Sequence, residues 1–254
     1  MPKTLTGNSP QREQRIQQII LDRIVIKYER RLAREIARAM NEGAAQFAAG
    51  KPVDIQAKHA LRLGRILKPL WGESAVTMAK HIGSHEKAAP RFEKKEAILP
   101  TSVANSVMTS WVNTYGTVQI TEISGTTQSQ IGAIINRSIE DGDSERQTAK
   151  AISSISAIRG ASRAATIART ETHSAANVAA DATAKAAGVK MRREWVSAEN
   201  ERTRKSHREA NGQIVGMDEP FQVGGYSLRW PSDYGRGIPA HLTINCRCAV
   251  AYIL

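Results

Sequence analysis

The most regular pattern in the chain is an apolar residue at every fourth position near its N-terminus. The series forms one stripe on a helix and consists of Ile16, Ile20, Ile24, Tyr28, Leu32, Ile36 and Met40. It predicts a helix over residues 10–41, about 45 Å long at 1.5 Å per residue, with Pro10 in the first turn and Gly43 as the C-terminal stop. We expect this helix to pack on its own chain, with docking on another protein as the alternative.

The pattern over residues 51–160 is weaker. A helical period over residues 60–71 is interrupted by Pro69, and residues 84–100 are charged and read as an exposed connection. Helices are expected from Thr101 and again over 127–141, where Gly142 ends the second. The capping spacing of Ser144 and Gln147 then predicts a helix that starts at about 145.

Residues 161–187 contain twelve alanines and no glycine or proline before Gly188. Alanine has the best helix propensity, so this segment is a firm helix prediction. After it, residues 189–197 alternate like a strand around Trp195, Asn200 could cap a short helix over 201–210, and residues 248–254 alternate again. Many glycines and prolines between 212 and 239 predict short strands joined by turns.

These elements predict a mainly α N-terminal section followed by a small α+β C-terminal module with short antiparallel strands. We divide the sequence into a variable, basic helical region (1–100), a helical section that includes the Ala-rich helix (101–188), and a nearly self-contained α+β module (189–254).

Charge changes this picture in one respect. The 254 residues have a net charge of +12, and the first hundred hold 19 basic and 10 acidic residues. This surplus favours a polyanionic neighbour, either nucleic acid or an acidic protein surface, although a solvated helix face explains it equally well.

The N-terminus lacks the apolar segment of a signal peptide, and no apolar run approaches the length of a membrane span. The only two cysteines, Cys246 and Cys248, are too few for a disulfide framework, so we expect synthesis in a reducing cytosol.

Three short motifs stand out in the second half. Residues 167–171 read IARTE, a polar segment from 202 to 207 follows Trp195, and residues 245–248 read NCRC. In this order, residues 120–254 resemble the phage Mu protein F family of minor head, or head morphogenesis, proteins. One departure is Asn200, where many members carry aspartate.

The resemblance implies a structural and assembly role in the head of a tailed phage. It implies contact with the portal vertex and with capsid or scaffold proteins, oligomers in the virion, and contact with packaged DNA. Synthesis would be in the cytoplasm of the bacterial host, without a membrane or an established cofactor. Two other hypotheses are an enzyme, of nuclease or transferase type, delivered with the phage DNA, and a plain DNA-binding protein. No nucleophile-plus-base or phosphate-loop motif supports the enzyme, and no helix-turn-helix signature supports the DNA-binding protein.

The motif residues Arg169, Glu171, Trp195 and Asn245 are expected to be structural rather than catalytic. Glu171 lies about 200° around the helix from Arg169, so the two cannot pair with each other. We therefore expect a buried polar bridge between this helix and the terminal module. Arg169, His173 and Asn177 share one stripe of the helix.

Two thiols close together can bind a metal. His207, Cys246 and Cys248 could hold zinc, with His241 or His173 as a fourth ligand. The alternative is a pair of small, buried, reduced thiols beside a turn, without any metal.

Overall fold

The computed structural model describes residues 4–83, 100–234 and 237–254, without the side chains of 156–159. The expected connection at 84–100 lies almost entirely outside these described residues. The described residues group into two compact units, one within 1–24, 70–111 and 169–254, and the other within 25–69 and 112–168. The expected sequence boundaries at 100 and 188 stay predictions.

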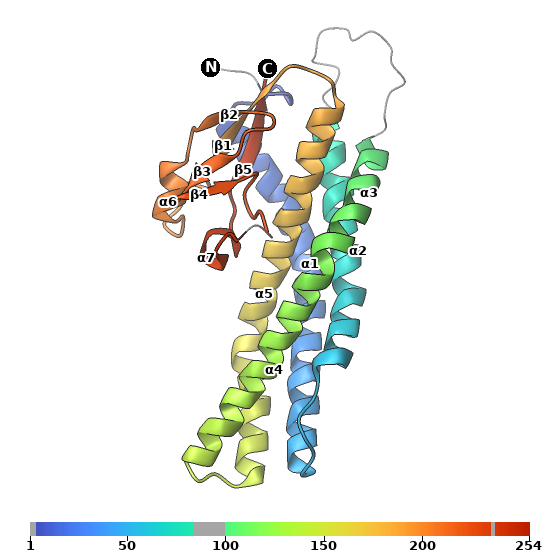
Figure 1. The fold of residues 1–254 in the computed structure, drawn as a ribbon, viewed down its shortest axis with the longest axis vertical. Helices are drawn as coiled ribbons and strands as arrows, with labels where there is room; N and C mark the ends of the chain where they lie inside the picture. The colour runs from blue at the N-terminus through green and yellow to red at the C-terminus, as the bar shows by residue number, and fades with distance from the viewer. Residues whose placement is uncertain (1–3, 84–99, 235–236) are drawn as a thin grey trace. The chain divides into compact units, whose positions relative to one another are not determined.

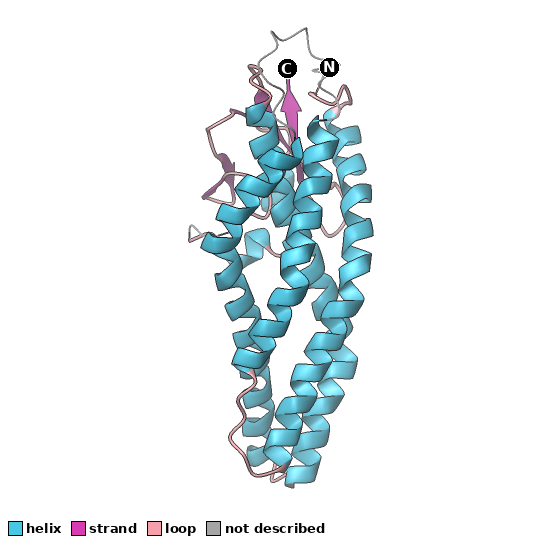
Figure 2. Cartoon of the chain, turned by 90° about the vertical axis from the view of Figure 1, so that its right-hand side faces the viewer, coloured by secondary structure: helices cyan, strands magenta, loops and turns pink. Residues whose placement is uncertain are grey.

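The helices make up most of the chain (Figure 2), and all but two short helices, α6 and α7, precede the strands (Figure 1). They are α1 (Pro10–Ala48), α2 (Gln56–Gly83), α3 (Pro100–Trp111), a π-helical turn (Val112–Gly116), α4 (Thr117–Glu140), α5 (Glu145–Ala186), α6 (Lys205–Glu209) and α7 (Ala240–Thr243). The predicted fold class is confirmed. No helix among the described residues is long and apolar enough to cross a membrane.

Helices α1 and α2 run further than expected. Gly43 does not stop α1, because the helix continues to Ala48 and the chain turns at Gly50, whose φ is +66°. Gly43 is instead a packing position, since an added Cβ would lie 2.7 Å from Cδ1 of Ile131. Pro69 does not interrupt α2. Its missing N–H leaves the Arg65 carbonyl without its helical donor, but both residues are exposed, so water can supply that hydrogen bond.

The second half of the helical section has fewer breaks than the sequence suggested. The helix expected over 127–141 begins ten residues earlier, at Thr117, directly after the π-helical turn. The predicted capping pair is present, with the Ser144 backbone N–H donating to Gln147 Oε1 at 2.9 Å. From there α5 continues without a break through Gly160, so the capped helix and the Ala-rich helix are one element.

The apolar stripe of α1 is core. Tyr28, Leu32, Ile36 and Met40 are each at most 3% exposed. The expectation that α1 packs on its own chain is therefore confirmed. The alternative, in which this stripe docks on another protein, is wrong because its central residues are already covered.

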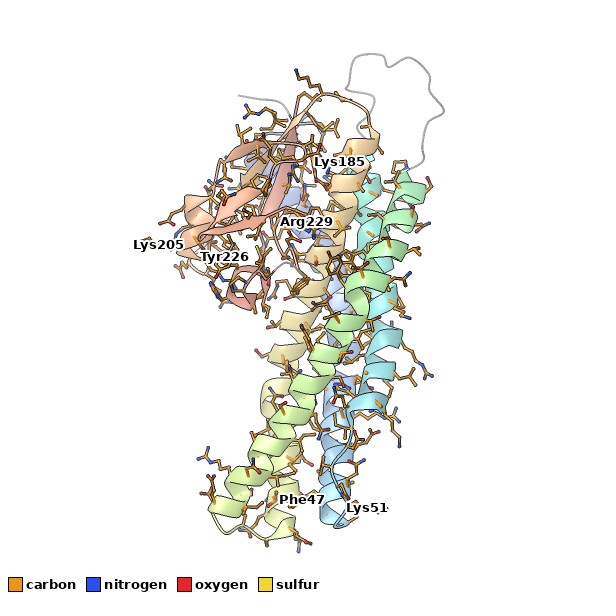
Figure 3. All side chains as sticks on the ribbon, in the orientation of Figure 1. Phe47, Lys51, Lys185, Lys205, Tyr226 and Arg229 are labelled. Carbon is orange, nitrogen blue, oxygen red and sulfur yellow. The ribbon has the colours of Figure 1, made fainter. Side chains whose placement is uncertain are left out.

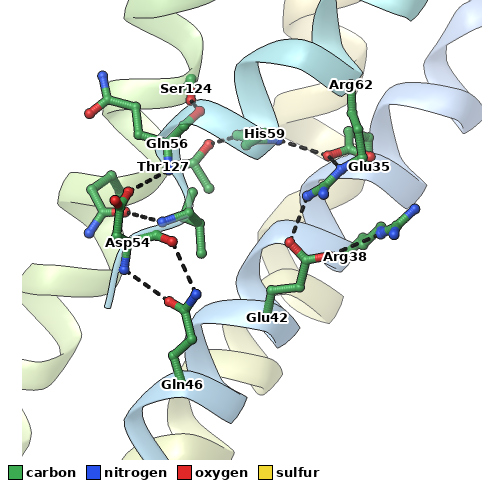
Figure 4. Close-up of polar contacts among 12 residues, drawn as sticks. Glu35, Arg38, Glu42, Gln46, Asp54, Gln56, His59, Arg62, Ser124 and Thr127 are labelled. Atoms are coloured by element: carbon green, nitrogen blue, oxygen red, sulfur yellow. Dashed lines mark hydrogen bonds and ion pairs between the residues drawn. The ribbon is translucent and has the colours of Figure 1, made fainter. Parts of the chain in front are cut away.

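A buried polar network crosses the unit formed by 25–69 and 112–168 (Figure 4). The His59 ring is fully buried, with Nδ1 2.9 Å from Glu35 Oε1 and Nε2 3.1 Å from Thr127 Oγ1. Arg62 donates to Glu35 at 2.7 Å, and Arg163 donates to Thr127 at 2.7 Å. These contacts join α1, α2, α4 and α5, and they give the buried groups the partners that burial requires.

The C-terminal module contains a three-stranded antiparallel sheet in the order β2-β1-β5 and a separate hairpin, β3-β4. The strands are β1 (Arg192–Val196), β2 (Ile214–Gly216), β3 (Phe221–Val223), β4 (Tyr226–Leu228) and β5 (Ala249–Ile253). The fully buried Trp195 on β1 packs edge-to-face against Phe221 and His207. The short helix expected over 201–210 begins only at Lys205, because the Asn200 side chain bonds the backbone of Arg202 in a turn instead.

The module is tied to α5 by a buried ion pair. Arg193, 2% exposed, donates to Asp181 on α5 at 2.9 Å and also to the backbone carbonyls of residues 216, 219 and 229. Lys185 Nζ also pairs with Asp181 Oδ2 at 3.1 Å. Figure 3 labels Lys185 on α5 and Arg229 in the module. Each of the three nitrogens of the Arg193 guanidinium thus has an acceptor inside the fold.

The first residues described by the structure belong to the same compact unit as the C-terminal module. The Leu5 backbone N–H donates to the Tyr252 carbonyl at 2.6 Å, beside an isolated bridge between Thr4 and Ile253. From α1, the amides of Gln14 and Gln17 donate to carbonyls of residues 247 and 250. Residues near the chain start thus add hydrogen bonds to the terminal module, and its expected near-independence stays a prediction.

Candidate functional site

The IARTE and NCRC motifs meet. The Arg169 guanidinium donates to Oδ1 of Asn245, and the Asn245 backbone N–H donates to Thr170 Oγ1 at 2.9 Å. Asn245 has φ of +60°, in the left-handed region that asparagine tolerates better than most residues. The backbone turn before the cysteines is thereby fixed against α5 by hydrogen bonds from both sides.

Glu171 has different partners from those of Arg169. Its carboxylate is 2% exposed and accepts from the Trp71 indole N–H at 2.8 Å and from the Tyr234 hydroxyl at 3.4 Å. Trp71 also packs edge-to-face on Trp111, with ring centroids 5.3 Å apart. The expected bridge between helix and module thus includes α2, and sequence spacing gave no signal for Trp71, which lies 100 residues away.

The stripe on α5 holds a second segment of the module. Asn177 donates to the Pro231 carbonyl at 2.8 Å, and Ser174 donates to the Ser232 carbonyl at 3.0 Å. His173, which shares the stripe with Asn177 and directly precedes Ser174, is 3% exposed. Burial, together with the charges of Arg247 and Arg169, lowers the pKa of His173 to about 3. This histidine is therefore neutral at physiological pH.

His207, Cys246 and Cys248 come together although they lie on two segments about 40 residues apart. All three are at most 3% exposed, and one ligand atom from each lies within 4.8 Å of the others. His207 Nδ1 is 3.5 Å from the Cys246 sulfur and 3.4 Å from the Cys248 sulfur, and both thiols are free. The cluster includes neither His173 nor His241.

The two thiols are inequivalent. A hydrogen bond from Cys248 holds the pKa of Cys246 well below its usual range, and His207 acts in the same direction. The Cys248 thiol donates that hydrogen bond, and the hydrogen bond together with burial raises the pKa of Cys248 well above its usual range.

A pocket of about 420 Å³ opens beside the cluster. Its lining includes the three cluster residues, Glu201 and four arginines from separate segments, namely Arg169, Arg202, Arg204 and Arg247. Arg204 is held by the Ile244 carbonyl at 2.6 Å, and Arg247 lies 3.8 Å from the Asp22 carboxylate. The pocket thus joins possible metal ligands to several positive charges, which suits an anionic group.

A family model described as "Phage Mu protein F like protein" matches residues 129–251. These residues belong to the phage Mu protein F-like family. The matched region includes all three motifs and the cluster, and it lies inside the range expected from the motifs.

Two curated relatives match parts of this chain. One is the minor head protein GP7 of Bacillus phage SPP1, 37% identical over 97 residues, which covers 34% of this chain and 28% of that protein. The other is "NAD(+)--arginine ADP-ribosyltransferase EFV" of Enterococcus faecalis, 32% identical over 71 residues, covering 28% of this chain and 14% of that protein. The chain thus spans less than a third of either relative, and no solved structure matches it.

Proposed function

We propose that this chain is a minor structural protein of a tailed-phage head, bound near the portal vertex and incorporated during procapsid assembly. The observation that carries the proposal is the family match over residues 129–251, together with the similarity to a minor head protein. In this proposal the IARTE and NCRC motifs help to build the fold, and the chain's partners are portal, capsid or scaffold proteins.

The contacts of the motif residues support a structural role. Arg169, Thr170 and Asn245 bind one another, while Glu171 binds Trp71 inside the same unit. Thr170 and Glu171 are buried, and buried polar groups with hydrogen-bond partners contribute to a unique fold. None of these contacts requires a substrate.

We propose further that the basic side of α1 faces packaged DNA. In the unit formed by 25–69 and 112–168, five basic residues spaced three or four apart on α1 are exposed, namely Lys27, Arg30, Arg31, Arg34 and Arg38. Such spacing places them along one side of the helix. A row of exposed guanidinium groups suits the phosphate backbone, which would be bound without sequence preference.

The DNA contact is tested by replacing Arg30, Arg31 and Arg34 with alanine together. Alanine favours helix, so the fold should persist. Binding of duplex DNA, followed by fluorescence anisotropy against salt, should weaken, and the log–log salt slope should fall by about 2 to 3. The matched control replaces Arg137, Arg146 and Lys150, which are exposed in the same unit. Equal effects of both triple variants, or tight binding only to an acidic protein, would contradict the DNA contact.

The portal contact is tested by co-expressing the full chain with portal and scaffold proteins. The chain should co-sediment with portal-containing procapsids and be absent from shells assembled without portal. Equal amounts in both kinds of shell would contradict a portal-specific position while leaving a head role intact.

A second candidate is an NAD-dependent transferase, which the similarity to the ADP-ribosyltransferase favours. The matched 71 residues are only 14% of that protein, so its named activity belongs to a much longer chain. Incubation of the purified chain with labelled NAD and a mixture of arginine-containing proteins distinguishes the candidates. A structural protein should transfer no label, and enzyme-dependent labelling would instead establish the transferase.

A further inference from the structure

The distances around His207 fit a tetrahedral metal. With Zn–S bonds near 2.3 Å and Zn–N bonds near 2.0 Å, neighbouring nitrogen and sulfur ligands lie about 3.5 Å apart. The His207 Nδ1 atom is 3.5 Å and 3.4 Å from the two cysteine sulfurs. The side chains therefore already stand at the separations that one shared ion would impose.

The same three groups satisfy one another poorly without an ion. The Nδ1 atom carries either one proton or one lone pair, so it can make a good hydrogen bond to only one of two sulfurs. Both cysteines and the histidine are at most 3% exposed, so little water can contact these groups even though they border the pocket. A cation between them bonds all three at once.

We infer that His207, Cys246 and Cys248 bind a zinc ion whose fourth coordination position opens into the arginine-lined pocket. Two thiolates and an imidazole are soft or borderline ligands that select zinc over magnesium or calcium. The cluster holds no fourth protein ligand among the described residues. Because all three ligand residues also line the pocket, water or an anionic oxygen reaches the ion from that side.

The ion would join two segments of the C-terminal module. His207 lies on α6, and the cysteines immediately precede β5, the edge strand that pairs with β1. Zinc would fix α6 against the start of β5, and its release should loosen the C-terminal module. This inference rests only on the cluster and the pocket, and it holds whether or not the chain is a head protein.

The test uses the full chain purified under reducing conditions with zinc supplied during expression. Elemental analysis should give about one zinc per chain, and a chelator should lower the thermal midpoint until zinc is restored. Replacing zinc with Co²⁺ should give thiolate-to-cobalt charge-transfer bands and the visible bands of a tetrahedral ion. Substoichiometric zinc, or a chelator without effect on the midpoint, would overturn the inference.

Variants locate the ligands. Cys246→Ser, Cys248→Ser and His207→Ala should each lose the cobalt spectrum, whereas the control His241→Ala, on an exposed position of α7, should keep it. Retention of the full cobalt spectrum when Cys246 and Cys248 are both replaced by serine would refute the assignment. If the variants misfold, the cobalt spectrum of the wild-type protein still tests the site. A wild-type spectrum without thiolate-to-cobalt bands would refute binding by the cysteines.

A small anion tests the open position. Thiocyanate added to the cobalt-loaded protein should shift the visible bands as it replaces water, and Arg247→Ala should weaken that response. An unchanged spectrum at saturating thiocyanate would contradict an open fourth position. A disulfide between Cys246 and Cys248 in freshly purified protein would contradict the metal site itself.

Discussion

Replacing Glu13 with glutamine should remove a pH-dependent part of the stability of this fold. Glu13 lies in the first turn of α1 and is 1% exposed. Its carboxylate accepts hydrogen bonds from Thr6 at 2.5 Å, Asn8 at 3.1 Å and Gln17 at 2.8 Å, and it lies 2.7 Å from His81 Nε2. Burial alone would raise the pKa, but the hydrogen bond and charge of His81, with Thr6 and Gln17, outweigh it and lower the pKa of Glu13 to about 2.

The size of the effect follows from that shift. A fall from the usual 4.5 to about 2, at 1.36 kcal/mol for each pKa unit, corresponds to about 3 kcal/mol. Because the pKa is lower in the folded state, the unfolded chain binds the proton first as the pH falls. The stabilisation is therefore complete above about pH 5 and is lost as the pH falls from 4.5 towards 2.

The assay is urea unfolding followed by tryptophan fluorescence. All four tryptophans lie in the unit that contains Glu13, so fluorescence reports on that unit. At pH 7, Glu13→Gln should lower the free energy of unfolding by about 3 kcal/mol, and the difference from wild type should shrink below about pH 4.5. The exposed control Glu122→Gln should change little at any pH. A Glu13→Gln deficit that stays constant from pH 7 to pH 3 would refute the reasoning.

Two further substitutions test the packing of α5. Ala176 is 1% exposed, so Ala176→Leu should overpack the helix contact and lower the free energy of unfolding by about 1–3 kcal/mol, whereas the exposed control Ala161→Leu should be neutral. Equal unfolding midpoints for both would disprove close packing. Arg193→Met should lower the free energy of unfolding by about 3 kcal/mol, because it leaves the buried Asp181 carboxylate with only the part-exposed Lys185 as an ion-pair partner. The double variant Arg193→Met with Asp181→Leu should be more stable in the same urea titration than Arg193→Met alone. A double variant whose loss of stability equals the sum of the two single losses would argue against the ion pair.

Periodicity predicted where the helices lie, but it could not predict how far they continue. Gly43 and Pro69 looked like terminators because they are poor helix formers in isolation. The structure contains both inside helices, since Gly43 allows Ile131 to approach closely and Pro69 lies on an exposed side. Local propensity was overridden at these two positions by tertiary contacts and by solvent access.

The candidate site was predictable in part. The motifs identified Arg169, Asn245 and the cluster of His207 with the two cysteines, and the structure brings each set together. The fourth zinc ligand expected from His173 or His241 is not in the cluster, because helical spacing does not show where a buried side chain lies relative to a distant turn.

The arginine pocket and the Trp71–Glu171 contact were not predictable from the sequence. The pocket is lined by residues from several separate segments, and Trp71 is 100 residues from its partner. The attachment of the chain start to β5 also escaped the sequence pattern, because backbone hydrogen bonds such as that of Leu5 to Tyr252 carry no side-chain signature.

The proposed head function is tested most directly by quantitative mass spectrometry of purified procapsids and mature heads. The account predicts that peptides of this chain are present in both particles at a low and constant ratio to the major capsid protein. Absence of the chain from both particles, with all of it free in the lysate, would contradict a role in the phage head.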